Sequence, residues 1–240
     1  MEAAARQALA PAGVLRMGLY AGSPTSFVAD AATGEARGVG HDLGLALAGR
    51  LGLAFEPVVY SRPAEVLEAA KAGRVDLAFT NATPARAKDL DFTPTVLAIE
   101  LGYLVPAGSP IADAAAVDAT GVRVGVSAGS TSEGVLAREL RQARLVAVAP
   151  LEAAGQWLAR GELDAFATNK AILHEMADGL AGSRVLAGRW GLESLALGIP
   201  KGRGAALPLL LAFAESAAAG GLVERAAARA GLRGWTKPGA

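Results

Sequence analysis

Residues 73–94 contain the side chains best suited to binding a small charged molecule. The apolar run 75–80 predicts a buried strand, and a polar turn follows it at once. Thr83 is a favourable N-cap and Pro84 a favourable first helical residue, so we expect a helix to begin there. The end of the strand and the start of this helix should therefore meet near Asn81.

This junction offers chemistry for a carboxylate. Asn81 supplies an amide, Thr83 a hydroxyl and the helix start free backbone N–H groups, while Arg86 lies one turn later. An arginine pairs with a carboxylate through two parallel hydrogen bonds, and a helix N-terminus favours negative charge. The alternative interpretation is an ordinary capped helix whose Arg86 forms a surface ion pair with Asp89 or Asp91.

The composition excludes several classes of function. The 240 residues carry 23 Lys and Arg and 23 Asp and Glu, so the formal net charge is zero, and no basic stripe with interleaved aromatic residues appears. Nucleic acid is therefore not expected as a partner. There are no cysteines, which rules out disulfides and thiolate metal sites. No apolar run approaches the ~20 residues that span a bilayer, and residues 1–12 are too polar for a signal-peptide core.

Motifs of enzymes and cofactor sites are also missing from the sequence. The two histidines, His41 and His174, lack metal-ligand spacing, and there is no Gly-x-Ser-x-Gly elbow. The Gly-rich stretches match neither the dinucleotide-binding fingerprint nor the phosphate-binding loop. We therefore expect no catalytic residue, no metal and no cofactor, and we expect His41 to lie on the surface at the start of a helix.

The order of the expected elements predicts an α/β fold. Strands and helices alternate along the chain, which indicates mostly parallel sheets flanked by helices. The expected strands are residues 14–20, 55–60, 75–80, 122–127, 145–148 and 163–168. The expected helices are residues 42–51 with Asp42 as the cap, 64–72, a helix from Pro84, 130–142, 151–160, 169–176 and 207–233.

A local repeat indicates two lobes. The segment Gly-Arg-Val-Asp-Leu-Ala-Phe-Thr-Asn from Gly73 recurs as Gly-Glu-Leu-Asp-Ala-Phe-Ala-Thr-Asn from Gly161. We expect lobe 1 to contain residues 1–97 and 194–240 and lobe 2 residues 98–193, with linkers near 95–103 and 192–197. Two crossings make a hinge on which a pair of lobes can close over a ligand.

The motifs, taken in order, resemble those of the family 3 extracellular solute-binding proteins, which are the amino-acid receptors of ABC importers. They are Gly13–Gly18, Gly38–Leu43, Gly73–Pro94, Gly121–Val126, Gly129–Thr131 and Gly161–Ala165. The resemblance runs from Gly13 to about Leu232. It implies the type II periplasmic-binding-protein fold, with two lobes, two hinge crossings and a ligand cleft between the lobes.

The resemblance also implies roles for individual residues. Arg86 would hold the α-carboxylate of the ligand, and the second-lobe hydroxyls of Ser130 and Thr131 would close on the same group. Read without the resemblance, Ser130 and Glu133 form a capping box that begins a helix.

The first loop and the following turn depart from the family pattern. Tyr20 and Ser23 would line the ligand site, but the stacking aromatic residue usual in this loop is absent or displaced, so Tyr20 or Tyr60 would take its place. Gly40 stands where some relatives have a carboxylate that meets a cationic ligand side chain. Ligands resembling lysine or arginine are therefore not favoured.

The sharpest departure is at Asn169, where the family usually has an aspartate that neutralises the α-ammonium of the ligand. Asparagine accepts a hydrogen bond but supplies no charge, and Lys170 adds a positive charge beside it. A buried ammonium without an anion costs several kcal/mol. Either Glu133, Glu100 or Glu193 supplies the charge, or the ligand is another small carboxylate, another anion or an atypical amino acid.

These observations predict a substrate-binding receptor of an ABC importer. We expect a periplasmic or otherwise extracytoplasmic monomer, with no signal peptide in this chain, that binds an amino acid or a related small carboxylate. Ligand would dock on Asn81, Thr83 and Arg86 first, closure would add the second-lobe groups, and a membrane permease would recognise the closed form. The alternatives are a dehydratase-like enzyme on the same fold, with one of the three glutamates as its acid, and a ligand-sensing domain.

Overall fold

The computed structural model describes residues 2–30 and 33–238, and their contacts divide the chain into two units. Unit 1 comprises Met1–Ala98, Ser194–Leu232 and Thr236–Ala240. Unit 2 comprises Ile99–Glu193 and Arg233–Trp235. The hinge expected from the sequence stays a prediction.

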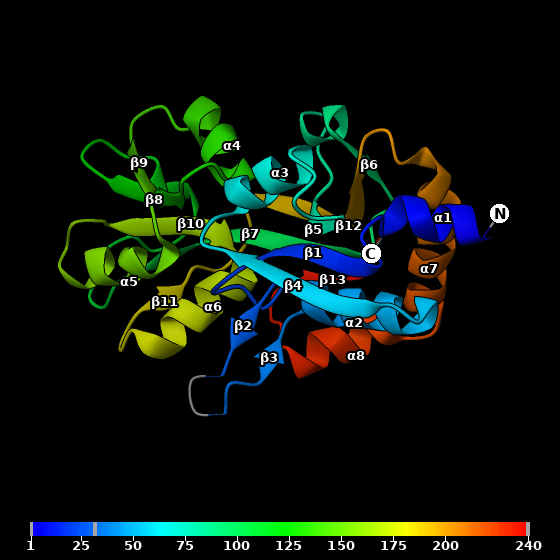
Figure 1. Cartoon of the computed structure of the whole chain (residues 1–240). Helices are drawn as coiled ribbons and strands as arrows, with labels where there is room; N and C mark the ends of the chain where they lie inside the picture. The colour runs from blue at the N-terminus through cyan, green and yellow to red at the C-terminus, as the bar shows by residue number, and fades with distance from the viewer. Residues whose placement is uncertain (1, 31–32, 239–240) are drawn as a thin grey trace. The chain divides into compact units, whose positions relative to one another are not determined.

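The sheet of unit 1 has three parallel strands in the order β4-β1-β5 (Figure 1). They are β1 (Val14–Tyr20), β4 (Ala54–Tyr60) and β5 (Leu77–Asn81). Part of β12 (Gly191–Pro200) pairs antiparallel with β5, and β6 (Leu90–Phe92) pairs antiparallel with β12. The carboxyl ends of β1, β4 and β5 therefore share one edge, which is where parallel sheets bind ligands.

Helices cover both faces of this sheet. α2 (Val39–Leu51) and α3 (Pro63–Lys71) lie on opposite faces, and α8 (Leu222–Arg229) packs on α2 (Figure 1). α1 (Glu2–Leu9) packs against α7 (Leu207–Ala219). Leu15, Met17 and Leu19 of β1 are fully buried in unit 1, so the carboxyl edge is supported by a close-packed core.

The sheet of unit 2 has the same plan. β8 (Arg123–Ser127), β9 (Arg144–Val148) and β10 (Ala165–Asn169) run parallel in the order β9-β8-β10. β7 (Leu97–Val105) pairs antiparallel with β10, and β11 (Arg184–Val185) pairs antiparallel with β7. The recurrence of the Gly-x-x-Asp segment along the chain thus corresponds to equivalent strands, β5 and β10.

The two faces of the unit 2 sheet have separate cores. α4 (Thr131–Glu139) covers one face, and α5 (Leu151–Ala159) and α6 (Lys170–Gly179) cover the other (Figure 1). Tyr103 and Val105 of β7 pack with Leu136 of α4. Leu104 between them packs with Leu158 and Leu173 of the other two helices. This alternation is the period of two that a strand buried on both faces requires.

The remaining elements are short. They are β2 (Val28–Ala29), β3 (Ala36–Arg37), β13 (Trp235–Thr236) and three 3-10 helices, η1 (Arg86–Lys88), η2 (Ala115–Val117) and η3 (Gly204–Ala206). In the part of the chain that the structure describes, no single helix is both long and apolar enough to cross a bilayer; the bent pair Gly204–Ala219 and Leu222–Arg229 meets the length and composition criteria only when taken together.

The expected linkers, residues 95–103 and 192–197, lie largely in the long strands β7 and β12, and the boundaries between the two units, Ala98/Ile99 and Glu193/Ser194, fall within these strands. The expectations for the start of α2 and for residues 207–233 are wrong. α2 begins at Val39 after Gly38, so Asp42 lies in its first turn and is not its cap. The expected helix 207–233 is broken at Gly220 and Gly221, where Gly221 has a positive φ of 69°.

Candidate functional site

Arg86 is held at the carboxyl end of β5 by two contacts from one nitrogen. Its Nη1 donates to Thr80 Oγ1 at 2.5 Å and to the carbonyl oxygen of Asn81 at 3.3 Å. The Thr80 side chain is buried and Arg86 is half-buried. Anchoring one nitrogen to the strand end fixes the position of the guanidinium at the edge where β1 and β5 finish.

The helix expected from Pro84 is wrong. The chain makes a turn, then the three-residue 3-10 helix η1, and enters β6 at Leu90. The segment before β6 has room only for such a tight turn. Thr83 still acts as a local cap, because its Oγ1 accepts a hydrogen bond from the Arg86 N–H at 3.3 Å. The contribution of a helix N-terminus to carboxylate binding is therefore absent here, and the guanidinium and the polar side chains remain.

The two acids considered as surface partners of Arg86 are engaged by lysines. Lys71 Nζ lies 3.0 Å from Asp89 Oδ2, and Lys201 forms an ion pair with Asp91. These pairs are partly exposed, so they contribute little to stability. They show how the chain neutralises the negative charge on the segment that follows Arg86.

Asn81, the last residue of β5, is hydrogen-bonded to Ser194 of β12. Its Oδ1 accepts a hydrogen bond from the Ser194 N–H at 3.0 Å, and the Ala82 N–H donates to the Ser194 carbonyl at 2.9 Å. The amide oxygen of Asn81 is thus used within unit 1. Its NH2 group is the part that suits a carboxylate, since it can only donate.

Tyr20 ends β1 at the same edge, and Ser23 follows it in a buried loop. The register that pairs Gly18 with Ala78 places Tyr20 level with Thr80, while Tyr60 is its partner on β4. The Ser23 side chain is fully buried, and its Oγ lies 2.8 Å from Thr25 Oγ1. Tyr20 therefore lies at the same sheet edge as Thr80 and Arg86. Ser23 instead forms a hydrogen bond inside its own loop.

Unit 2 places its predicted residues at two helix starts on one sheet edge. β8 and β10 are parallel neighbours, and each leads into a helix whose N-cap was predicted to bind ligand. Ser130 Oγ accepts from the Glu133 N–H at 3.1 Å, and Asn169 Oδ1 accepts from the Ile172 N–H at 3.1 Å. The capping roles are therefore real, and any ligand contact would add to them.

Thr131, the first residue of α4, contacts Glu193 of β12. Its Oγ1 donates to Glu193 Oε1 at 2.5 Å, and both residues are half-buried. The sequence named Glu193 only as one of three acids. Nothing in the sequence around Glu193 indicates this partner, because the two residues are 62 positions apart.

The other two acids have different environments. Glu133 Oε2 accepts a hydrogen bond from the Gly129 N–H at 2.6 Å, which completes the start of α4. Glu100 pairs with Lys170 at 2.6 Å and with Arg189 at 3.5 Å. The hydrogen bond from Lys170 lowers the pKa of Glu100 despite partial desolvation. Lys170 is 13% exposed, so its side chain does not point into solvent.

His41 was expected at the surface, and this is wrong. It is buried between the rings of Phe27 and Phe55, with edge-on centroid distances of 5.9 and 5.4 Å. Its Nδ1 lies 3.0 Å from Asp42, which also pairs with Arg229 at 2.6 Å. His41 is thus a packed core residue. The described residues contain no cluster of three His, Asp or Glu side chains that could hold a metal ion.

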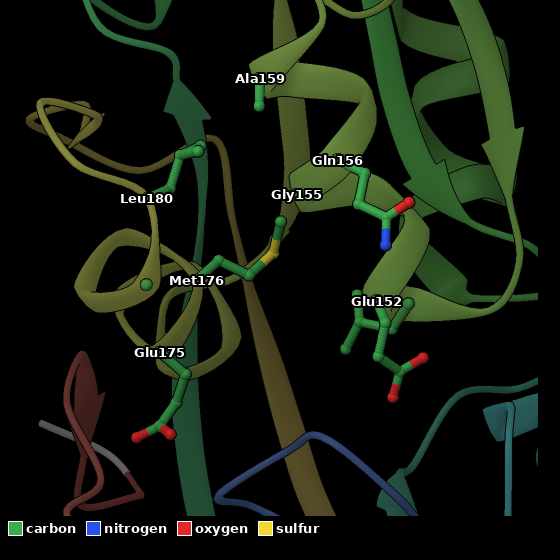
Figure 2. Close-up of a pocket in the computed structure, with 9 residues that line it drawn as sticks. Glu152, Gly155, Gln156, Ala159, Glu175, Met176 and Leu180 are labelled. Atoms are coloured by element: carbon green, nitrogen blue, oxygen red, sulfur yellow. The ribbon is translucent and has the colours of Figure 1, made fainter.

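A separate cavity of about 410 Å³ lies between α5 and α6 (Figure 2). Glu152 and Gln156 line it from α5, and Glu175 and Met176 line it from α6. Its charged lining groups are carboxylates, which do not suit an anionic ligand. None of the predicted ligand-binding residues lines this cavity, so it is not the candidate site.

The chain matches known proteins over most of its length. The family model for bacterial extracellular solute-binding proteins, family 3, matches residues 15–225. A search of curated protein sequences found no match.

Solved structures of similar fold include amino-acid-binding proteins. A solute receptor for L-cysteine from Neisseria gonorrhoeae is 24% identical with a TM-score of 0.83, covering 95% of this chain and 92% of its own. An amino acid ABC transporter substrate-binding protein from Streptococcus pneumoniae, bound to L-arginine, is 19% identical with a TM-score of 0.84, covering 93% and 97%. An ancestral amino-acid-binding protein, described as a precursor of cyclohexadienyl dehydratase, is 23% identical with a TM-score of 0.79, covering 92% and 96%.

These comparisons confirm the family resemblance and the α/β periplasmic-binding-protein fold that the sequence predicted. At such identities the likeness to the solved structures establishes the fold alone. The family match spans residues 15–225 and includes every predicted ligand-binding residue. The chain belongs to family 3 of the bacterial extracellular solute-binding proteins.

Proposed function

We propose that this protein is the substrate-binding receptor of an amino-acid ABC importer, and that Arg86 binds the α-carboxylate of its ligand. The observation that carries the proposal is the anchoring of Arg86 Nη1 to Thr80 and Asn81 at the carboxyl edge of β5. Parallel sheets bind ligands at this edge, and a positioned guanidinium is well suited to a carboxylate. The Asn81 NH2 group and the Thr83 hydroxyl supply further polar groups.

The second set of contacts would come from unit 2. Ser130 and Asn169 lie at the starts of α4 and α6, where neighbouring parallel strands end, while the Thr131 hydroxyl beside Ser130 already donates to Glu193. In our proposal the ligand docks on the unit 1 residues first, and closure on the hinge adds the unit 2 groups. A ligand favours closure only through contacts that it makes better in the closed state.

The partners and the location follow from the family. Proteins of this family are extracellular solute-binding proteins, and the similar structures include receptors described with amino acids. We therefore propose a periplasmic or extracytoplasmic location and a membrane permease that recognises the closed form. Because the family is one of solute-binding proteins, binding without chemical change is the function that we propose.

A thermal-shift screen tests this proposal. The protein would be unfolded, washed and refolded to remove bound ligand, then heated with the common amino acids, betaines, small mono- and dicarboxylates and phosphonates. A ligand at ~100 times its Kd stabilises the folded state by ~2.7 kcal/mol. A shift with amino acids or small carboxylates, with the compound recovered unchanged, supports a receptor. No shift, or recovery of a chemically altered compound, contradicts it.

A further inference from the structure

We propose that Glu193 is the anion that binds the α-ammonium group of the ligand, so that the protein selects α-amino acids although Asn169 supplies no charge. This inference rests on the proposed receptor function and names the ligand class of that site. It makes Glu193 a specificity-determining residue on a different strand from Asn169.

Glu193 and Asn169 belong to strands on opposite sides of β7. Asn169 ends β10 and pairs with Leu101 of β7. The carbonyl oxygen of Leu101 accepts a hydrogen bond from the Trp190 N–H at 3.0 Å. Leu101 therefore lies between Asn169 on one side and Trp190 on the other. Glu193 follows Trp190 by three residues. The contact of Glu193 with Thr131 ties it to the start of α4, which lies at the same sheet edge as Asn169.

The neighbouring charges single out Glu193 among the three acids. Glu100 already faces two cations, Lys170 and Arg189, and the positive charge of Lys170 is used there. Glu133 accepts a backbone hydrogen bond in the first turn of α4.

Of the residues that the structure describes, none forms an ion pair with Glu193. Its carboxylate is oriented by the neutral Thr131 hydroxyl, which fixes its direction without cancelling its charge. A half-buried, oriented carboxylate without a cation is the partner that a ligand ammonium requires. An ammonium buried without such a partner would be strongly disfavoured.

The experiment compares amino acids with analogues that lack only the ammonium. Calorimetric titrations would use L-glutamine with glutaramate, L-alanine with propanoate, and L-arginine with guanidinopentanoate. The proteins would be the wild type, Glu193→Gln, Glu193→Asp and the double variant Glu193→Gln/Asn169→Asp. Glu152→Gln, an exposed acid on α5, is the matched control for loss of one negative charge.

We expect the wild type and Glu152→Gln to bind at least one amino acid about 30-fold or more tightly than its analogue, a difference of ~2 kcal/mol. Glu193→Gln should remove that preference by weakening amino-acid binding and should leave analogue binding within about threefold. The double variant should recover at least tenfold of the loss, because a carboxylate returns at Asn169. Glu193→Asp keeps the charge and should retain part of the preference. It therefore shows whether a loss of binding in Glu193→Gln comes from the missing charge or from misfolding.

Three results would overturn the inference. If Glu193→Gln and Glu193→Asp bind amino acids as the wild type does, or more tightly, Glu193 does not meet the ammonium, while the receptor function stands. If the wild type prefers the analogues, the ligand class is wrong, while carboxylate binding stands. If the wild type binds none of the six compounds, both the inference and an amino-acid receptor of this kind are contradicted.

Discussion

Arg16 donates three hydrogen bonds to the buried carboxylate of Asp76. The Arg16 backbone N–H and Nε donate to Asp76 Oδ2 at 3.1 and 2.9 Å, and Nη2 donates to Oδ1 at 2.8 Å. Arg203 Nη1 adds a contact of 2.7 Å to Oδ1, and the Asp76 side chain is fully buried. The pair joins the start of β1 to the chain just before β5.

Unit 2 repeats this geometry. The backbone N–H and Nε of Arg123 donate to Asp164 Oδ2 at 2.7 and 2.9 Å, and its Nη2 donates to Oδ1 at 2.9 Å. Asp76 and Asp164 are the aspartates of the two Gly-x-x-Asp segments. The motif therefore recurs because each unit uses its aspartate to lock the first parallel strand to the third.

Replacing Asp76 with asparagine should destabilise the protein by ~3 kcal/mol, because Arg16 and Arg203 would keep their charges beside a neutral group. Urea unfolding of the wild type and the variant measures the difference. Asp164→Asn is the matched control, and since that pair is about one-third exposed, its loss should cost about 1 kcal/mol or less. Equal costs at the two positions would contradict this interpretation.

The Asp76 contribution should also depend on pH. Burial raises the pKa of Asp76, but the hydrogen bonds from Arg16 and Arg203 outweigh it and hold the pKa below the ordinary 3.8. As the pH falls, the unfolded chain therefore takes up this proton first, so the stabilisation is present above about pH 4 and is lost below it. The difference in the free energy of unfolding between the wild type and Asp76→Asn should become smaller on going from about pH 7 to about pH 3. A difference that stays constant over this pH range would contradict the prediction.

Much of the fold could be predicted because local patterns agree with the final structure. The strand Val14–Tyr20 is found as expected, since its apolar residues are read directly as a buried strand. The strands β7 and β12 were not among the expected strands, and the expected linkers, residues 95–103 and 192–197, lie largely within them. Their role depends on pairing with distant strands, such as Asn169 with Leu101 and Leu195 with Asn81, and a single sequence does not reveal such pairings.

Two glycines of α2 should respond in opposite ways to alanine. A Cβ at Gly44 would lie 2.4 Å from Met17 Sδ and 2.7 Å from the Phe55 ring, whereas a Cβ at Gly49 meets nothing within 4 Å. Gly44→Ala should therefore cost ~1–2 kcal/mol by overpacking, and Gly49→Ala should gain ~0.5–1 kcal/mol from helix propensity. Thermal unfolding of both variants checks this. A stabilised Gly44→Ala protein would show that the α2–β1 packing is looser than described.

Asn169 should contribute to stability as the N-cap of α6, independently of any ligand. Its Oδ1 accepts the Ile172 N–H, and the residue is 4% exposed. Asn169→Ala should cost ~1 kcal/mol, while Asn169→Ser should recover most of it because serine is an equally good cap. Urea unfolding without ligand measures both. If alanine and serine are equivalent, capping is not what Asn169 contributes.

Thr131 should affect binding through its hydroxyl. Thr131→Val removes the donor that orients Glu193 and should weaken amino-acid binding about tenfold, or ~1.4 kcal/mol. Thr131→Ser keeps the donor and should bind within about threefold of the wild type. Calorimetry with L-glutamine, L-alanine and L-arginine provides the measurement. If Thr131→Ser binds amino acids as weakly as Thr131→Val does, the hydroxyl alone does not account for the contribution of Thr131, and its methyl group is required.

The candidate site could be predicted from the sequence only in part. Arg86, Asn81 and Thr83 were identifiable because a polar group directly follows a buried strand. The role of Thr80 in holding Arg86 was missed, because its side chain was read as the end of the strand. The Thr131–Glu193 contact was missed because it joins the first residue of α4 to a residue of β12 that lies 62 positions later in the sequence, and such a separation gives no signal.

The most direct test of the central claim is calorimetric titration of Arg86→Ala with whichever amino acid or small carboxylate stabilises the wild type. Arg50→Ala, an exposed arginine at the end of α2, is the control for loss of one positive charge. We predict that Arg86→Ala loses about 100-fold or more in affinity, or ~2.7 kcal/mol, with a nearly unchanged ligand-free melting temperature, and that Arg50→Ala binds normally. Unchanged affinity, or a large fall in the ligand-free melting temperature, would contradict the assignment of Arg86 as the carboxylate anchor.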